Sequence, residues 1–204
     1  MNIPSPIFVG YFPKITAQRN TIETDTDAMW FKNGIIEEVC SVSDCISKGP
    51  EGWIDKCKHN DFGFYDTEES ALSVIQDNRE KYDLYAYKLY PLKFIEGKTV
   101  DFKVDSNASE KLDSYAFIGY DVVSRSVADF FECSALSCSN GCEVFSVNRF
   151  CLMQDLEEAL QCCRRISEDI AAAETLKRPD GMFEYHGKWE PGPYFLIQVF
   201  RKQR

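Results

Sequence analysis

The sequence has no long apolar run and no secretory signal. No segment approaches the roughly 18–20 consecutive apolar residues that a membrane-spanning helix needs. Residues 1–6 lack a basic segment followed by an apolar stretch, so a signal peptide is not expected. Nine cysteines without a signal are typical of reduced thiols rather than of a disulfide framework. We therefore expect a cytoplasmic protein without a membrane partner.

A surplus of basic residues is also missing. The chain carries 23 Lys and Arg against 33 Asp and Glu, which gives a net charge of −10. Residues 1–100 contain 11 basic and 16 acidic residues, and residues 101–204 contain 12 basic and 17 acidic residues. Each part therefore carries a net charge of −5. Proteins that bind nucleic acids concentrate Lys and Arg to neutralise phosphates. The composition therefore excludes a nucleic acid as the expected partner.

The common catalytic signatures are absent. The sequence contains no Walker A motif, no G-x-G-x-x-G, no H-E-x-x-H and no G-x-S-x-G. Its two histidines, His59 and His186, each lie in a stretch rich in polar residues. A cysteine nucleophile would need one of them as its base. We therefore favour a protein without catalytic activity and expect no cofactor.

What is present indicates a folded α+β chain. Hydrophobic residues make up 44% of the 204 residues, which is enough for one packed domain over residues 1–204. β-branched and aromatic residues predict four strands: Ile7–Phe12, Tyr82–Tyr90, Tyr115–Ser124 and Tyr194–Arg201. Capping patterns at Asp66 and Asp155 predict two helices. The first would run to Arg79 and the second to Ile170.

The two halves of the chain resemble each other. Four pairs of segments match in the same order: Phe8–Tyr11 with Phe117–Tyr120, Cys40–Cys45 with Cys133–Cys138, Asp66–Leu72 with Asp155–Leu160, and Tyr85–Lys88 with Gln198–Arg201. We interpret them as two pseudo-repeats, at about 5–100 and 112–204. A duplicated chain can serve as its own pseudo-dimer, so we expect a monomer.

The element order favours a ferredoxin-like fold. Strand, helix and strand, repeated once, correspond to a duplicated βαβ-βαβ antiparallel sheet with helices on one face and long loop insertions. The connection over residues 13–65 is too long for the simple form, and Val39–Val42 and Phe130–Cys133 are candidates for extra short strands. The alternative is two similar small α+β lobes packed together.

Four cysteines are candidate metal ligands. In the ferredoxin-like arrangement, we expect the segments that follow the first and third strands to meet at one sheet edge. Cys40, Cys45, Cys133 and Cys138 would then offer four thiolates to zinc. The wide spacing within each pair favours the alternative that they are core residues.

Aromatic and basic residues provide the candidate ligand site. Trp53, His59, Phe62 and Tyr65 lie in one long loop, and Trp189 lies in a second aromatic-rich segment. Aromatic walls with a few polar groups are typical of ligand pockets, although the same aromatics can anchor a loop to the core. Two arginines, Arg125 and Arg149, could bind a carboxylate or phosphate, or form internal salt bridges.

The function that these observations favour is a non-catalytic binding module. It would hold a small-molecule ligand or a partner protein through its aromatic-rich loops. The alternative is a cysteine-dependent enzyme or a protein with a four-cysteine metal site. A third hypothesis is an acidic protein that neutralises a basic partner, and it predicts a contiguous acidic face.

Overall fold

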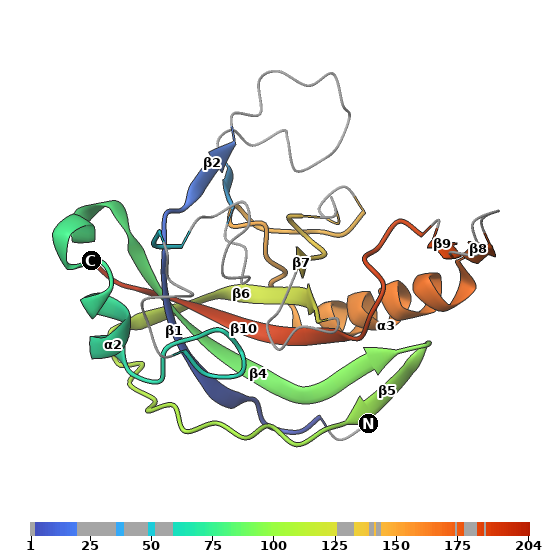
Figure 1. Ribbon diagram of the computed structural model, residues 1–204, viewed down its shortest axis with the longest axis horizontal. Coiled ribbons are helices and arrows are strands. Elements are labelled where there is room, and N and C mark those ends of the chain that lie inside the picture. The colour runs from blue at the N-terminus through green and yellow to red at the C-terminus, as the bar shows by residue number, and fades with distance from the viewer. Residues whose placement is uncertain are drawn as a thin grey trace.

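A computed structural model describes residues 3–19, 36–38, 49–51, 59–125, 133–138, 141, 144–173, 175–177, 183–185 and 187–204 (Figure 1). Its strands are β1 (Ile7–Lys14), β2 (Ala17–Arg19), β3 (Ile36–Glu38), β4 (Asp83–Ile95), β5 (Lys98–Asp101), β6 (Tyr115–Ser124), β7 (Cys133–Ser134), β8 (Thr175–Lys177), β9 (Phe183–Tyr185) and β10 (Tyr194–Lys202). Its helices are α2 (Glu68–Ser73), the 3₁₀-helix η3 (Gln76–Lys81) and α3 (Leu156–Ala172).

The main sheet is antiparallel and has the order β1-β4-β10-β6-β7, with β5 paired to β4. Two small hairpins, β2-β3 and β8-β9, stand apart from it. Helix α3 packs against β10, β4, β6 and β5, whereas α2 packs against β1. The chain is therefore a mixed α+β structure with one central curled sheet, as the composition predicted.

The four predicted strands are confirmed as β1, β4, β6 and β10, with one notable extension. Strand β4 continues through Pro91 to Ile95, beyond the predicted end at Tyr90. The β4-β10 register is irregular between Phe195 and Ile197, which is the stretch of β10 opposite Pro91. A proline lacks an N–H donor but is tolerated where the ladder is irregular. The strand therefore passes through the proline.

The ferredoxin-like strand order is not found. The two strands of a βαβ unit run parallel, but β1 pairs directly and antiparallel with β4, and β6 pairs in the same way with β10. One sheet joins both halves through the antiparallel β4-β10 pair, so separate lobes are not found in the described part either. Strands β1 and β6 are consequently separated by β4 and β10. The sheet order therefore does not bring the segments that follow β1 and β6 together.

Each half contains a β-bulge that ends at a glycine. The register of β1 on β4 shifts between Phe8 and Gly10, and the register of β6 on β10 shifts at the matching Gly119. Both glycines have positive φ, +130° and +146°. A Cβ at Gly10 would lie 2.6 Å from the Tyr65 carbonyl oxygen, and one at Gly119 would lie 2.6 Å from the Leu152 Cβ. Only glycine fits this close approach without strain.

An asparagine side chain ties the segment before each helix to the bulge. Asn60 Nδ2 donates to the Val9 carbonyl at 2.8 Å, and its Oδ1 accepts from two backbone N–H groups, those of Phe62 and Phe64. Beyond this turn, Tyr65 pairs with Tyr11 on the outer edge of β1. The asparagine therefore fixes the chain that leads into α2.

The second half repeats this arrangement. Asn148 Nδ2 donates to the Ile118 carbonyl at 2.7 Å, and Asn148 Oδ1 accepts from the N–H groups of Phe150 and Leu152. Tyr120 and Met153 exchange backbone hydrogen bonds at the edge of β6. The same short motif therefore positions the start of α3.

The helix starts agree with the capping prediction to within one residue. Asp155 caps α3, as predicted, and accepts from the Glu158 N–H at 3.0 Å. The cap of α2 is Thr67 rather than Asp66. Asp66 instead accepts a hydrogen bond from the Asn60 side chain. The first predicted helix is also split, because α2 ends at Ser73 and η3 follows it.

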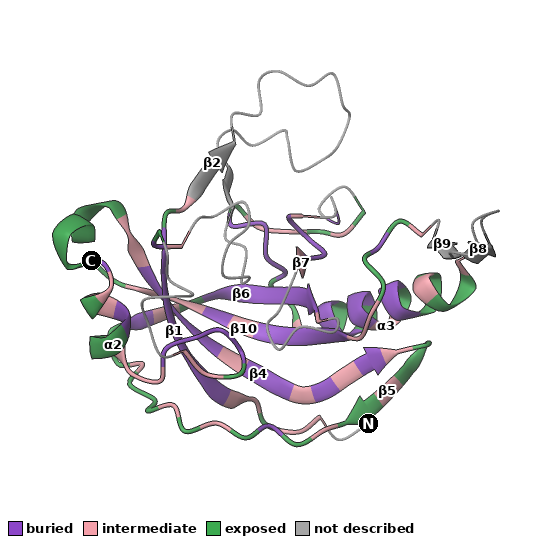
Figure 2. Cartoon of the chain, in the orientation of Figure 1, coloured by how far each residue is buried: buried purple, intermediate pink, exposed green. Residues whose placement is uncertain are grey.

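Buried residues concentrate in the central strands and on the inner face of α3, whereas α2 and η3 are largely exposed (Figure 2). On α3, the buried positions are Ala159, Leu160, Cys162, Cys163, Ile166 and Ser167. This stripe at helical spacing matches the predicted apolar face. Within the ranges described, no helix is both long enough and apolar enough to cross a membrane.

Replacing Asn148 by alanine is expected to destabilise the fold by about 2–4 kcal/mol. The change removes three hydrogen bonds and leaves half-buried backbone groups of Ile118, Phe150 and Leu152 without that partner. Urea denaturation of the full chain measures the loss. Asn78→Ala is the control, since the exposed Asn78 side chain bonds only Lys81 among the described residues, and it should change stability by less than about 0.5 kcal/mol. Equal effects of the two variants would contradict the role of Asn148.

Candidate functional site

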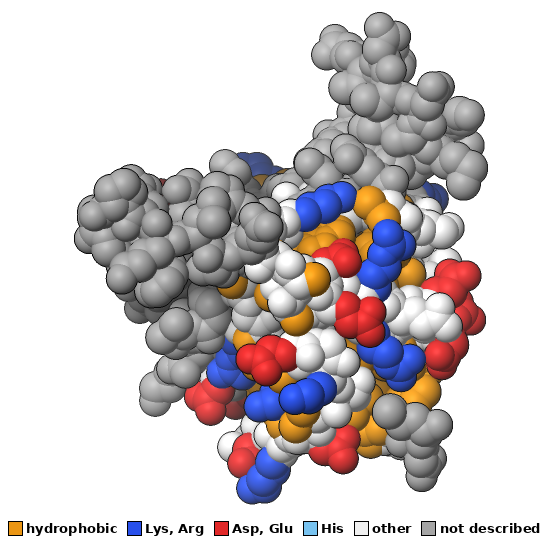
Figure 3. Space-filling view, turned by 90° about the vertical axis from the view of Figure 1, so that its right-hand side faces the viewer, with side chains coloured by type: hydrophobic (Ala, Val, Ile, Leu, Met, Phe, Trp, Pro, Cys, Tyr) orange, Lys and Arg blue, Asp and Glu red, His pale blue; other side chains and the backbone are white. Residues whose placement is uncertain are grey.

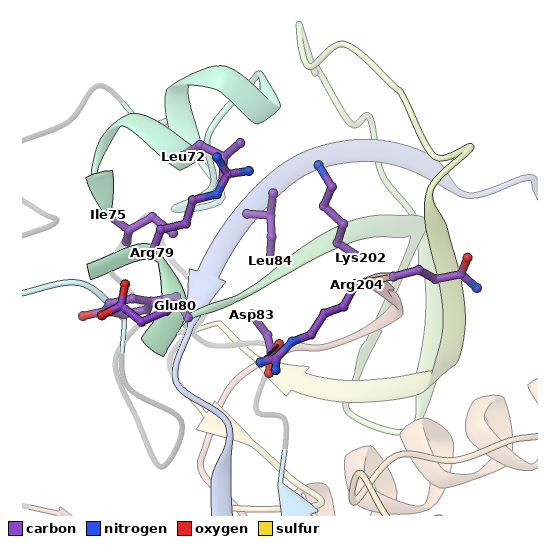
Figure 4. Close-up of a pocket in the computed structure, with 10 residues that line it drawn as sticks. Leu72, Ile75, Arg79, Glu80, Asp83, Leu84, Lys202 and Arg204 are labelled. Atoms are coloured by element: carbon purple, nitrogen blue, oxygen red, sulfur yellow. Dashed lines mark hydrogen bonds and ion pairs between the residues drawn. The ribbon is translucent and has the colours of Figure 1, made fainter. Parts of the chain in front are cut away.

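A hollow of about 370 Å³ lies between the short helices and the ends of the central strands. We call it the α2 hollow. Figure 4 shows residues of α2 and η3 on one side of it and residues of β4 and the chain's last segment on the other. Its lining consists of Leu72, Ile75, Arg79, Glu80, Tyr82, Asp83, Leu84, Lys202, Gln203 and Arg204. The chain's final residues lie beside α2 in Figure 1, so segments far apart in sequence form one wall.

The hollow exists because the helical segment is short and bent. Helix α2 contains six residues, and η3 follows with a non-helical residue, Asn78, at φ −142° and ψ 27°. Asp77 and Asn78 are poor helix formers, because their side chains compete for nearby backbone groups. The chain therefore turns away here and enters β4 at Asp83. The ends of β4 and β10 are left without a helix over them.

The floor of the hollow is apolar and its rim is charged. Ile75 and Leu84 are 4% and 5% exposed, and Leu72 is half-buried. Arg79 extends over this surface from η3 (Figure 4). In the described part of the chain, the Arg79 guanidinium forms no ion pair. An apolar surface beside an available guanidinium suits a ligand with an apolar body and an anionic group.

The other cations of the rim already hold carboxylates. Asp83 accepts from Arg201 at 2.7 Å and from Arg204 at 3.0 Å, and its side chain is only 9% exposed. Thr16 donates a further hydrogen bond to it at 3.0 Å. Three donors on one nearly buried carboxylate restrain Arg201, whose side chain is 23% exposed, whereas the Arg204 side chain stays 78% exposed.

A second cluster joins α2 to the two strands behind it. The Glu68 carboxylate accepts from the Tyr115 hydroxyl at 2.8 Å and forms an ion pair with Lys202. Burial, followed by the hydrogen bond to Glu68, raises the pKa of Tyr115 well above its ordinary value of 10.0. A tyrosine that bonds to a carboxylate keeps its proton, because ionisation would put two negative charges together.

A second hollow, of about 360 Å³, lies on the other side of the chain's last residues. We call it the Phe150 hollow. Its lining consists of Ala116, Ile118, Arg149, Phe150, Arg201, Lys202, Gln203 and Arg204. The two hollows share Lys202, Gln203 and Arg204, so the last segment of the chain separates them.

The aromatic loop predicted as a ligand wall is mostly core where it is described. Phe62 and Tyr65 are 5% and 1% exposed, and the Tyr65 ring stacks on Phe12. His59 is half-buried, and Trp53 lies outside the described residues. Trp189 is 3% exposed, and its indole N–H donates to Asp169 at 3.0 Å. The described aromatics therefore anchor their segments to the sheet and to α3.

Both predicted arginines lie against aromatic rings. The Arg125 guanidinium carbon is 5.7 Å from the centre of the Phe62 ring, and Arg125 donates to the Asp61 carbonyl at 3.4 Å. Arg149 lies 4.7 Å from the Phe150 ring centre. The structure thus brings together two predicted site residues, Arg125 and Phe62. Of the predicted residues that the structure describes, Arg149 lines one of these two hollows.

The cysteine prediction stays open. Cys133 and Cys138 are half-buried, whereas Cys40 and Cys45 lie outside the described residues, as does His186. Where side chains are described, no three His, Cys, Asp or Glu residues gather as a potential metal site. Burial raises the pKa of the Cys162 and Cys163 thiols, which makes them poor nucleophiles.

Charge is mixed on the face seen in Figure 3. Blue Lys and Arg side chains alternate there with red Asp and Glu side chains. The hypothesis of an acidic neutralising protein predicted a contiguous acidic face instead. This view therefore gives that hypothesis no support.

Sequence reasoning missed the residues that line the α2 hollow. Leu72, Ile75 and Arg79 fall within the first predicted helix, and Glu80 follows its predicted end, so none of them was a candidate site residue. One signal was available: three of the last four residues, Arg201, Lys202 and Arg204, are basic in a chain of net charge −10. Such a local excess indicates an anion site or a set of internal ion pairs.

The chain matches no protein-family model, no curated protein and no solved structure. Its function therefore has to be inferred from its own residues and hollows.

Stability is expected to fall as the pH rises above 10. The folded chain holds the Tyr115 proton more tightly than the unfolded chain does, so this stabilisation is complete below pH 10.0 and is lost as the pH rises towards the folded-state pKa. Tyr115→Phe should flatten the decline, measured as the urea midpoint at about pH 9 and about pH 11. Tyr82→Phe is the control, and a decline that is the same in all three proteins would contradict the role of Tyr115.

Proposed function

We propose that this protein is a non-catalytic binding module that holds a small organic anion in the α2 hollow. Small-molecule sites usually measure about 300–1,000 Å³ and combine apolar walls with a few polar groups. At about 370 Å³, the hollow suits a ligand of modest size. The ligand's apolar body would contact Ile75, Leu84 and Leu72. Its carboxylate would bind the Arg79 guanidinium.

The observation that carries this proposal is the difference between Arg79 and the other cations of the rim. Lys202 and Arg204 are paired with Glu68 and Asp83, whereas no carboxylate in the described residues pairs with Arg79. Because a guanidinium can bind a carboxylate through two parallel hydrogen bonds, Arg79 supplies both affinity and orientation. We propose that the protein acts in the cytosol and that its binding partner is this small organic anion.

We also infer that the two halves arose by duplication of one unit. In both halves, a glycine in a β-bulge is followed by an asparagine that bonds to the bulge and then by a capped helix. Seven residues separate Asn60 from its cap Thr67, and seven separate Asn148 from Asp155. The matching helices differ in length, with 6 residues in α2 and 17 in α3. The shorter copy leaves strand ends uncovered, and this is the space that the ligand would fill.

Hydrophobic carboxylates should bind to the full chain, and Arg79→Gln should weaken the binding at least tenfold. Losing a charge-assisted hydrogen bond costs about 1.5–3 kcal/mol, and 1.4 kcal/mol corresponds to tenfold in affinity. The probes are hexanoate and phenylacetate, compared with their neutral amides and followed by NMR chemical-shift changes and calorimetry. The amides should bind more weakly than the acids.

Lys81→Gln is the matched control. It removes one positive charge from the same 3₁₀-helix, but Lys81 does not line the hollow. The control should keep the affinity of the unmodified chain. An equal loss of affinity in both variants would show that Arg79 acts only through its positive charge and not through a specific contact with the ligand. Shift changes remote from Leu72, Ile75 and Leu84 would place the ligand elsewhere, and either result would refute the proposal.

A further inference from the structure

The Phe150 hollow has an unusual charge balance for this chain. Four cations line it, Arg149, Arg201, Lys202 and Arg204, and no carboxylate side chain among the described residues does. The chain as a whole carries a net charge of −10. A concave site lined by one sign of charge concentrates ions of the opposite sign. The local field here therefore opposes the field of the rest of the molecule.

Carboxylates behind the hollow cancel only part of this charge. Asp83 holds Arg201 and Arg204, and Glu68 holds Lys202. Arg149 forms no ion pair in the described part of the chain, and its described contact is the Phe150 ring. Among the described residues, these two carboxylates pair with three of the four cations. The remaining polar group of the lining, Gln203, is neutral.

Two guanidinium groups converge on one ring. The guanidinium carbons of Arg149 and Arg201 lie 4.7 Å and 5.8 Å from the Phe150 ring centre. Asp83 orients Arg201 further, and the ring restricts Arg149. Phe150 is itself 8% exposed and is fixed by the hydrogen bond of its N–H to Asn148. The ion pair with Asp83 therefore places the Arg201 donors before any ligand arrives, which reduces the entropy cost of binding.

We propose that the Phe150 hollow binds the dianionic group of a small phosphate monoester. Such a group carries a charge of about −1.5 to −2 at pH 7 and offers three acceptor oxygens, which suit the four cationic side chains of the lining and their guanidinium forks. The organic part of the ligand would lie on Ala116 and Ile118, the apolar part of the lining. This site is distinct from the Arg79 site, although the two hollows share Lys202, Gln203 and Arg204.

Phenyl phosphate is the probe, titrated by calorimetry into the full chain in buffer free of phosphate and sulfate. We expect saturable binding at one site. Benzenesulfonate, which has a similar shape but one negative charge, should bind at least tenfold more weakly. Inorganic phosphate, which lacks the apolar part, should also bind more weakly. Absence of phenyl phosphate binding would overturn the proposal, and so would equal affinity for phenyl phosphate and benzenesulfonate.

Arg149→Gln should weaken phenyl phosphate binding at least tenfold, and Arg149→Lys should restore only part of the loss, because an ammonium lacks the guanidinium fork. Arg125→Gln is the matched control: Arg125 lies against Phe62 as Arg149 lies against Phe150, but it is outside the lining. An equal loss in the Arg125 variant would overturn the proposal. Arg79→Gln should bind phenyl phosphate normally, so failure at this site leaves the function proposed for the α2 hollow untouched.

Discussion

The close approach of backbone to backbone at Gly10 and Gly119 is the constraint on which the rest of the structure depends. At each glycine a strand bulges, and the segment that precedes a helix packs against it with no room for a Cβ. An asparagine of that segment donates one hydrogen bond to a carbonyl of the bulge and accepts two from N–H groups of its own segment. Because the helix follows within seven residues, its starting point on the sheet is fixed by this contact.

The hollows follow from that geometry. The contact at Gly10 places α2 beside β1, and the short helix ends before it covers the ends of β4 and β10. The contact at Gly119 places Phe150 beside Ile118, where Arg201 of β10 also reaches the ring. The same motif therefore builds one wall of each hollow, and the last segment of the chain supplies the wall between them.

Local patterns in the sequence predicted the elements, but they could not predict how the strands pair. Strand β6 matches its expected bounds, and Asp155 caps α3 as expected, because alternation and capping depend on neighbouring residues. The order β1-β4-β10-β6 depends on contacts between residues about 70–110 positions apart, which leave no periodic trace. The β-bulges could not be predicted either, because a glycine inside a strand can mark a bulge or simply weaken the pairing of that strand.

The candidate sites were hard to predict for a related reason. The net charge is −5 on each side of residue 100, so the sequence shows no basic half. The local group of basic side chains forms only in the folded chain, where Arg149 lies near residues 201–204. Within that group, Arg201, Lys202 and Arg204 form ion pairs with the carboxylates of Asp83 and Glu68. Of the described arginines that line the two hollows, Arg79 and Arg149 form no ion pair with a described residue, so their guanidinium groups can receive an anion. Both are exposed residues, and replacing them removes no described ion pair. Variants at these two positions can therefore lose ligand binding without a loss of stability.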